Sequence, residues 1–316
     1  MWTTMCRLLP TEPKTRKPGP TRCISPACRC VPTPRPTITG CGNDMSSEVS
    51  RQDIAAAFRS AGARPGDLLL FHSSLKSMGH VDGGAQTVID GALDAVAPGG
   101  TVAVPTLWYN GKPLERRKED FDLKTSPAWN GLVAETMRQD SRAVRSDHFT
   151  HSVSAIGPFA AELTSNHGSG RPFPSPWSET AFAEVSPWSK LYQFNALYAF
   201  IGCGMKSCTM KHWIESRYVS GLLDRLPETE RGRCRKLLAY ERQKGPWCYF
   251  DGRTMYLRLA AQGLIRTVRL GDTLLFAFRT RPMADAALRE LERDPENWFH
   301  PLILEWRKMV LDLIHQ

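Results

Sequence analysis

Strand-like and helix-like segments alternate along the chain from residue 50 onward, and this alternation constrains the fold more than any other feature of the sequence. The apolar pattern of a buried strand recurs at residues 67–72, 101–105, 152–157, 196–202 and 272–278. Helical periodicity fills the intervening segments, as in GAQTVIDGALDAV. Strands that are apolar throughout and separated by helices are typical of a sheet covered on both faces. We therefore predict an α/β fold, a three-layer αβα sandwich around a central, mostly parallel sheet.

Composition separates a short N-terminal segment from the rest of the chain. The first 44 of the 316 residues contain five of the nine cysteines, eight of the 23 prolines and more than half of the net charge of +9. We expect residues 1–44 to be a poorly ordered extension and residues 45–316 to form the folded domain. That domain has no stripe of basic and aromatic residues and no apolar run of about 18 residues, so neither nucleic acid nor a membrane is a predicted partner. Its four remaining cysteines predict a reducing, cytoplasmic location.

The longest stretch without periodicity runs from residue 107 to residue 129. It exceeds the usual length of a connector, which indicates a substrate-facing or lid segment. Asp120 and Asp122 within it are candidate contacts for a cationic substrate. Neighbouring basic residues offset these carboxylates, so a solvated charged loop is the alternative interpretation.

Thr209, His212 and Glu215 recur at every third position after the strand-like run at 196–202. On a helix, this spacing places the three side chains on one flank. An imidazole paired with a carboxylate is the arrangement of a positioned general base, and the end of a strand is a usual place for α/β sites. A surface ion pair has the same spacing, so the motif alone leaves both interpretations open.

Two further segments carry polar side chains next to predicted strands. HSSLK, residues 72–76, offers hydroxyls, backbone N–H groups and a lysine that suit a phosphate or an oxyanion, although an ordinary turn with helix caps has the same composition. RSDHFTHS, residues 145–152, contains two histidines whose spacing matches no common metal site. Hydrogen bonding or contact with a polar ligand is the preferred interpretation there, and no metal is predicted.

Three segments in register resemble the aminoglycoside 3-N-acetyltransferase family. They are HSSLKSMGHVDGGAQTVIDGALDAVAPGGTVAVPT, RSDHFTHSVSAIGPFAAELTSNH and SPWSKLYQFNALYAFIGCGMKSCTMKHWIE, in the order and with the gaps of that family. The resemblance implies a three-layer αβα fold distinct from the GNAT acetyltransferases. It also implies transfer of an acetyl group from acetyl-CoA, as co-substrate, to a primary amine without a metal.

The same resemblance implies roles for individual residues. His212 matches the catalytic base of the family, Glu215 matches the residue that orients it, and Thr209 begins the same element. His167 matches a family histidine that faces the site. The residues that we expect to border the acyl-CoA are Ser73, Ser74, Leu75, Lys76, Arg145, Ser146, His148 and Ser152.

The chemistry of amide formation agrees with these roles. An acceptor amine is mostly ammonium near neutral pH, so a base must remove a proton before or during attack of the nitrogen on the thioester, and an imidazole suits that task. The oxyanion that forms needs hydrogen-bond donors. Backbone N–H groups around Ser73 and Ser74, or the hydroxyl of Thr209, are the candidates.

Several alternatives stay open at this point. THSVSAIG and SPWSKL resemble the broader branch of the family more than its aminoglycoside-modifying members, so the acceptor is an aminoglycoside, another antibiotic or natural product, or a cell-surface amino sugar. Cys208, four residues before His212, offers a different mechanism through an acyl-enzyme, as a transferase or a hydrolase. A non-enzymatic binding protein is the third alternative. The expected partners are a small-molecule amine and an acyl-CoA, bound by a monomer or homodimer.

Overall fold

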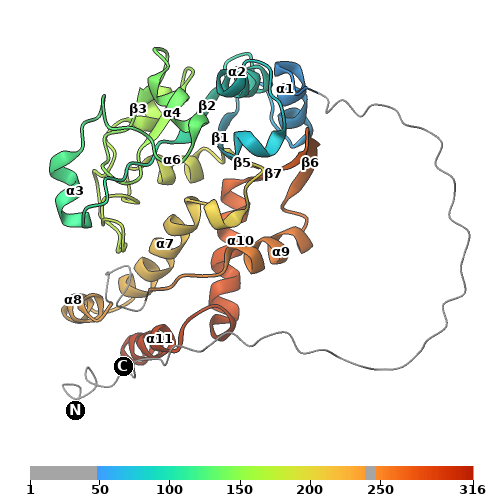
Figure 1. Ribbon diagram of the computed structural model, residues 1–316. Coiled ribbons are helices and arrows are strands. Elements are labelled where there is room, and N and C mark those ends of the chain that lie inside the picture. The colour runs from blue at the N-terminus through green and yellow to red at the C-terminus, as the bar shows by residue number, and fades with distance from the viewer. Residues whose placement is uncertain (1–47, 239–246, 316) are drawn as a thin grey trace, which may run out of the picture. The chain divides into compact units, whose positions relative to one another are not determined.

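The sheet at the centre of the computed structural model is built from seven strands within the described residues, 48–238 and 247–315 (Figure 1). The predicted extension at residues 1–44 lies outside this range. The strand order is β3-β4-β2-β1-β5-β7-β6. The bounds are β1 Leu68–Ser73, β2 Thr101–Pro105, β3 Val144–Arg145, β4 Val153–Ile156, β5 Leu197–Ile201, β6 Arg266–Leu270 and β7 Thr273–Arg279.

Parallel strands occupy the middle of the sheet. β1 pairs in parallel with β2 on one side and with β5 on the other, so that Leu69 lies opposite Val102 and Leu197. The outer pairs, β2 with β4, β4 with β3, β5 with β7 and β7 with β6, are antiparallel. The predicted α/β class is confirmed, and the sheet is mixed because its parallel strands are confined to the centre.

One face of the sheet is covered by three helices, α1 (Arg51–Ser60), α2 (Gly84–Val96) and α4 (Leu132–Gln139). Their buried side chains form one core with alternate residues of the strands, such as Phe71 and Val104. A capping box fixes the start of α1, because Ser50 Oγ accepts from Asp53 N and the Asp53 carboxylate accepts from Ser50 N at 2.9 Å.

The opposite face packs against a larger set of helices. Its core joins strand residues of the other parity, such as Leu70, Tyr198 and Phe200, to residues of the helices. These helices are α5 (Ala160–Thr164), α6 (Pro187–Gln193), α7 (Met210–Asp224), α9 (Gly252–Ala261), α10 (Thr280–Arg293) and α11 (Pro301–Ile314). α8 (Glu228–Lys236) follows α7 and contributes Cys234 to this core. Helices on both faces of one sheet give the three predicted layers.

The long segment between β2 and α4 is not wholly irregular, because it contains α3 (Leu114–Asp120). Its start and its end nevertheless lie together: the backbone of Trp129 donates to the carbonyl of Leu107 at 3.0 Å, and Asn130 bonds to both Leu107 N and Pro105 O at 2.9 Å. The segment therefore leaves the sheet at the carboxyl end of β2 and returns to the same place.

The turn after β5 depends on a glycine. Gly202 has φ of 62°, a left-handed conformation that side chains other than glycine rarely adopt, and a Cβ there would lie 1.6 Å from Ser77 Oγ. Glycine thus allows the β5–α7 connection to pass against the loop after β1, which brings two of the predicted motifs side by side.

Within the described part of the chain, none of the helices has the length and apolar composition of a membrane-spanning segment.

Candidate active site

A cavity of about 600 Å³ opens where the three central parallel strands end. His72 and Ser73 come from the end of β1, Pro105 from the end of β2, and Cys203 follows β5. Since parallel strands end at the same edge of a sheet, these side chains meet there, as is usual for ligand sites in α/β folds. The start of α7 adds Cys208, Thr209 and His212, and the segment before α4 adds Leu107, Trp108, Tyr109, Arg117, Trp129 and Asn130.

His212 and Glu215 form a hydrogen-bonded pair on the first turns of α7. His212 Nδ1 lies 2.9 Å from Glu215 Oε2, with the imidazole 21% exposed and the carboxylate fully buried. A carboxylate accepts only, so Nδ1 carries the ring proton and Nε2 keeps its lone pair. Among the described residues nothing hydrogen-bonds to Nε2, and His212 lines the cavity. This geometry is that of a base whose tautomer is fixed by its partner.

Glu215 has charged and polar neighbours that partly compensate its burial. Oε2 also accepts from Trp247 Nε1 at 3.2 Å, while Oε1 has no hydrogen-bond partner among the described residues and lies 3.6 Å from the ammonium of Lys211. An isolated buried carboxylate is costly, and a cation together with two N–H donors lowers that cost. The three contacts hold the carboxylate in place beside the imidazole of His212.

Aromatic rings surround the imidazole of His212. The ring centroids of Trp177, His151 and Tyr249 lie 5.2, 6.2 and 6.3 Å away. These neighbours leave the His212 ring little freedom to rotate away from Glu215, so the imidazole keeps one orientation at the cavity wall.

The cysteines near the base are poor nucleophiles. Burial raises the pKa of the Cys208 thiol to about 12 and that of Cys203 to about 11. Only the thiolate attacks a carbonyl, and at these values almost none is present near neutral pH. Cys208 therefore lines the cavity in its protonated form.

The HSSLK segment borders a second hollow next to the cavity. Ser73 and Asn130 line both, and Ser74, Leu75 and Lys76 line the neighbouring groove of about 680 Å³. Ser74 N donates to the carbonyl of Ile201 at 2.8 Å. The expectation that this N–H is a donor to an oxyanion is wrong, because the β1–β5 ladder already uses it.

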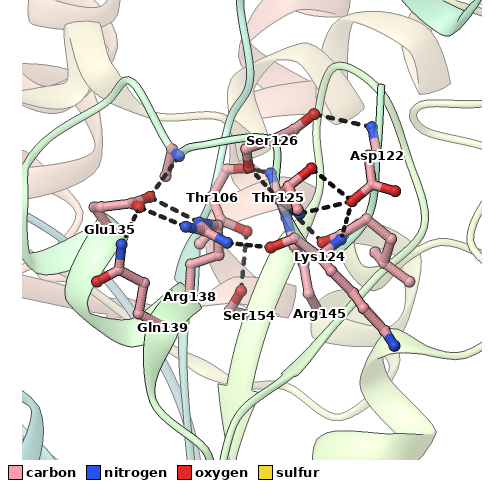
Figure 2. Close-up of polar contacts among 12 residues, drawn as sticks. Thr106, Asp122, Lys124, Thr125, Ser126, Glu135, Arg138, Gln139, Arg145 and Ser154 are labelled. Carbon is pink, nitrogen blue, oxygen red and sulfur yellow. Dashed lines mark hydrogen bonds and ion pairs between the residues drawn. The ribbon is translucent and has the colours of Figure 1, made fainter. Parts of the chain in front are cut away.

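Arg145, one of the expected acyl-CoA contacts, instead joins the segment 107–130 to the sheet (Figure 2), and Ser152, another of them, takes part in the same hydrogen bonds. The guanidinium donates to the carbonyls of Ser126 at 2.6 Å and Thr106 at 2.9 Å, and to Ser152 Oγ at 3.1 Å. Ser152 Oγ donates in turn to the Thr106 carbonyl at 2.6 Å. Burial lowers the pKa of Arg145 to about 10. Neither residue lines the cavity or the neighbouring groove.

Ser146 and His148, which are buried, form a polar cluster with the partly buried His167. The rings of His148 and His167 stack with centroids 4.5 Å apart, and Ser146 Oγ lies 2.9 Å from His167 Nδ1. Nε2 of His167 lies 2.9 Å from the carbonyl of Ala181, so both ring nitrogens have protein partners. Burial lowers the pKa of His148 well below 6.5 and that of His167 to about 4, which keeps both rings neutral. None of the three lines the cavity.

Asp120 and Asp122 point into contacts within their own segment. Asp120 pairs with Lys112 at 2.6 Å and accepts from Asn110 at 2.8 Å. The carboxylate of Asp122 accepts from Thr125 N at 2.7 Å and closes a turn (Figure 2). The structure does not bring either carboxylate to the cavity, whose lining from this segment is mainly aromatic.

Sequence reasoning missed several residues that complete the site. Trp247 lies 32 positions after Glu215 and no local pattern connects the two. His151 lines the cavity and belongs to a cluster that the sequence did single out, but spacing could not separate it from His148.

Within the described residues, no group of three His, Cys, Asp or Glu side chains is arranged to hold a metal ion.

The layered sheet and the His212–Glu215 pair at the cavity wall define an α/β protein whose site is organised around a hydrogen-bonded imidazole and carboxylate. The chain belongs to the aminoglycoside 3-N-acetyltransferase family, whose sequence model matches residues 70–292. The resemblance noted from the sequence is thereby confirmed.

Curated relatives and solved structures agree with this placement. Aminoglycoside N(3)-acetyltransferase IX of Micromonospora chalcea is 29% identical over 189 residues, which are 55% of this chain and 64% of the relative. Aminoglycoside N(3)-acetyltransferase III of Serratia marcescens is 32% identical over 179 residues, 52% of this chain and 63% of the relative. The matched part of the chain thus spans less than two thirds of each relative.

Several solved structures of similar fold are aminoglycoside acetyltransferases. AAC(3)-Xa superposes with a TM-score of 0.61 and 24% identity over 78% of this chain and 93% of its own. AAC-IIIb, solved as a binary complex with CoASH, has a TM-score of 0.60 and 21% identity over 78% and 97%. The expected fold, distinct from that of the GNAT acetyltransferases, is confirmed.

Proposed function

We propose that this protein transfers an acetyl group from acetyl-CoA to a primary amine of a small molecule, with His212 as general base and Glu215 as the residue that orients it. The observation that carries the proposal is the 2.9 Å contact between His212 Nδ1 and the buried Glu215 carboxylate, at the wall of the cavity. Membership in the acetyltransferase family supports the reaction class.

The proposed step follows from the protonation states at the site. His212 Nε2 accepts a proton from the amine as the nitrogen forms its bond to the carbonyl carbon, and the π electrons of the carbonyl move to oxygen. Glu215 stabilises the imidazolium that results. When the carbonyl re-forms, the C–S bond breaks and the imidazolium returns its proton to the departing thiolate. The products are an amide and CoA thiol, and His212 is again neutral.

Two hollows beside the cavity support a reaction of two substrates. The groove with Ser74, Leu75 and Lys76 meets the cavity at Ser73 and Asn130. Its backbone, hydroxyls and ammonium suit the phosphate-bearing arm of acetyl-CoA. A larger hollow of about 1100 Å³ meets the cavity at Cys203 and Lys206. An acyl donor and an acceptor can thus approach His212 from different sides.

The acceptor is the less defined partner. Aminoglycosides, the substrates named for the relatives, are polycations. Among the described residues that line the cavity, Arg117 and Lys206 are the charged side chains, and carboxylates are absent. This lining favours a second candidate, an N-acyltransferase that acts on a natural product or amino sugar of lower positive charge. A Cys208 acyl-enzyme is disfavoured by the pKa of about 12 of that thiol.

Thiol release from acetyl-CoA, measured with the purified protein and a panel of amines, tests the proposal. The panel contains aminoglycosides, neutral amino sugars, amino-nucleosides and antibiotic precursors, so the same assay separates the two acceptor classes. His212→Ala should lower kcat at least a hundredfold while acetyl-CoA binding is kept, because only the proton acceptor is lost. His315→Ala, an exposed histidine at the end of α11, is the matched control. Normal turnover by His212→Ala would refute the assignment of the base.

We propose that residues 45–316 form the domain that carries the activity, and that the protein acts in the cytoplasm. Deletion of residues 1–44 should then leave kcat for thiol release unchanged.

A further inference from the structure

His72 lies in the wall of the same cavity as His212, and the mechanism above does not use it. Its ring is held by two aromatic residues of the neighbouring strand β5. Phe200, directly opposite in the register, stacks on it with centroids 5.2 Å apart and planes inclined by only 7°. The hydroxyl of Tyr198 lies 2.7 Å from His72 Nε2. The ring therefore has a fixed plane and a fixed partner at one nitrogen.

The hydroxyl of Tyr198 decides which nitrogen of His72 carries the proton. Met210 N donates to this hydroxyl at 3.4 Å, so the oxygen already accepts one hydrogen bond. Burial raises the pKa of Tyr198 well above 10 and lowers the pKa of His72 to about 3, so both groups are neutral at physiological pH. The hydroxyl has one hydrogen to donate, and Nε2 offers a lone pair when the ring proton lies on Nδ1, so this tautomer satisfies the contact. Nε2 then accepts, and the single ring proton lies on Nδ1.

The Nδ1–H of His72 has no competing partner in the described protein. No described residue hydrogen-bonds to His72 Nδ1. This nitrogen is also not among the fully buried side-chain atoms that lack a partner, so it contacts the cavity that His72 lines. The Tyr198 hydroxyl also ties His72 to the start of α7, because Met210 lies between Thr209 and His212. A fixed, uncharged N–H donor is thus held in the cavity of the base.

We propose that His72 is a catalytic residue whose Nδ1–H donates a hydrogen bond to the thioester carbonyl oxygen as this oxygen becomes an oxyanion. The inference rests on the proposed acetyl transfer. His72 transfers no proton: the carbonyl π electrons move to oxygen when the nitrogen–carbon bond forms, and they return when the C–S bond breaks. Because the ring is held by Phe200 and Tyr198, it needs no reorganisation during the reaction, which is the condition for strong stabilisation of an oxyanion. This donor takes the place first expected for Ser74 N.

Two substitutions separate the donor at Nδ1 from the contact at Nε2. A glutamine amide reaches the position of Nε2, so His72→Gln keeps the contact with Tyr198 and loses the cavity donor. An asparagine amide reaches the position of Nδ1, so His72→Asn keeps the donor and loses the contact. Tyr198→Phe leaves His72 in place and frees its tautomer. His315→Ala is the control.

The readout is the infrared carbonyl band of acetyl-CoA labelled with ¹³C at the thioester carbon and bound to each protein, which needs no acceptor amine. The band should lie at lower frequency on the wild type and on His72→Asn than on His72→Gln. With an acceptor, His72→Gln should lower kcat about 100- to 1000-fold and His72→Asn at least tenfold less, with the Kd of acetyl-CoA within threefold of the wild type.

The outcomes distinguish this inference from the proposed function. An identical carbonyl band on the wild type and on His72→Gln would overturn the role of His72 alone. If His72→Gln does not fold, His72→Phe replaces it, because a phenyl ring keeps the stacking on Phe200 and has no donor; an unchanged band and kcat there would overturn the role equally. A wild-type protein that binds no acetyl-CoA would overturn the proposed acetyl transfer together with this inference.

Discussion

Substitution of Glu215 by glutamine tests how the His–Glu pair works, because the change removes a charge and little else. Both His212 Nδ1 and Trp247 Nε1 donate to the same oxygen, Oε2, at 2.9 and 3.2 Å. The carbonyl oxygen of a glutamine must therefore take this position, and its NH₂ group takes the place of Oε1, toward the ammonium of Lys211. The proton stays on His212 Nδ1, so the tautomer that a base requires is preserved.

The expected loss is electrostatic. Opposite unit charges about 4 Å apart attract by about 4 kcal/mol at an effective dielectric constant of about 20. This attraction exists only once His212 has become an imidazolium, so it lowers the barrier and not the energy of the resting enzyme. About 1.4 kcal/mol corresponds to a factor of ten, so kcat should fall about a thousandfold.

Steady-state thiol release at saturating acetyl-CoA measures this loss, with the free energy of unfolding followed in parallel by urea titration. Glu228→Gln, at an exposed position in the first turn of α8, is the matched control and should behave as the wild type. A folded Glu215→Gln protein whose kcat stays within tenfold of the wild type would refute the reasoning, since the buried carboxylate would then contribute nothing to the imidazolium.

Other predictions follow from the buried polar groups. Burial lowers the pKa of both His72 and His148, so below about pH 6.5 the unfolded chain binds protons that the folded chain does not. The free energy of unfolding should therefore decrease by about 1.4 kcal/mol per pH unit for each of the two residues. Urea titrations at pH 6.5 and 5 that give equal stability would contradict this. Arg145→Met should destabilise the protein by about 3 kcal/mol in urea unfolding, since it leaves the carbonyls of Leu123 and Ser126 without this donor. A loss below about 0.5 kcal/mol, roughly the scatter of surface changes, argues against that tether. Cys208→Ala should keep kcat within threefold and show no acyl adduct by mass spectrometry, whereas abolished turnover would revive the acyl-enzyme. Lys76→Ala should raise KM for acetyl-CoA about tenfold and leave KM for acetyl-pantetheine, which lacks the phosphates, unchanged. An equal change in KM for both acyl donors would show that the phosphates bind elsewhere.

The centre of the fold was predictable because its segments have one unambiguous pattern. β1, β2 and β5 are mainly apolar, and residues 84–96 form the helix that their periodicity predicts. The outer parts were not predictable in the same way. β6 contains two arginines, is mostly exposed and pairs only with β7, and β3 has two residues. Such strands exist through tertiary pairing, which local propensity does not contain.

The site was predictable where one helix provides both partners. The spacing of His212 and Glu215 predicted that their side chains meet, since helical geometry places residues three apart on one flank. The orientation of side chains on different elements could not be deduced in this way. Whether Ser146 faces a ligand or His167 depends on how β3, β4 and the following loops pack, and the structure turns it toward His167.

The cavity is assembled from two parts of the chain that have little else in common. The proton acceptor and its carboxylate lie on α7, anchored in the core, while the facing wall comes from residues 107–130, fastened through the guanidinium of Arg145. In the proposed reaction, proton transfer therefore depends on α7, and the choice of amine depends on the facing segment. Replacement of the facing segment should redirect the proposed acetyl transfer to another amine and leave the His212–Glu215 pair unaltered.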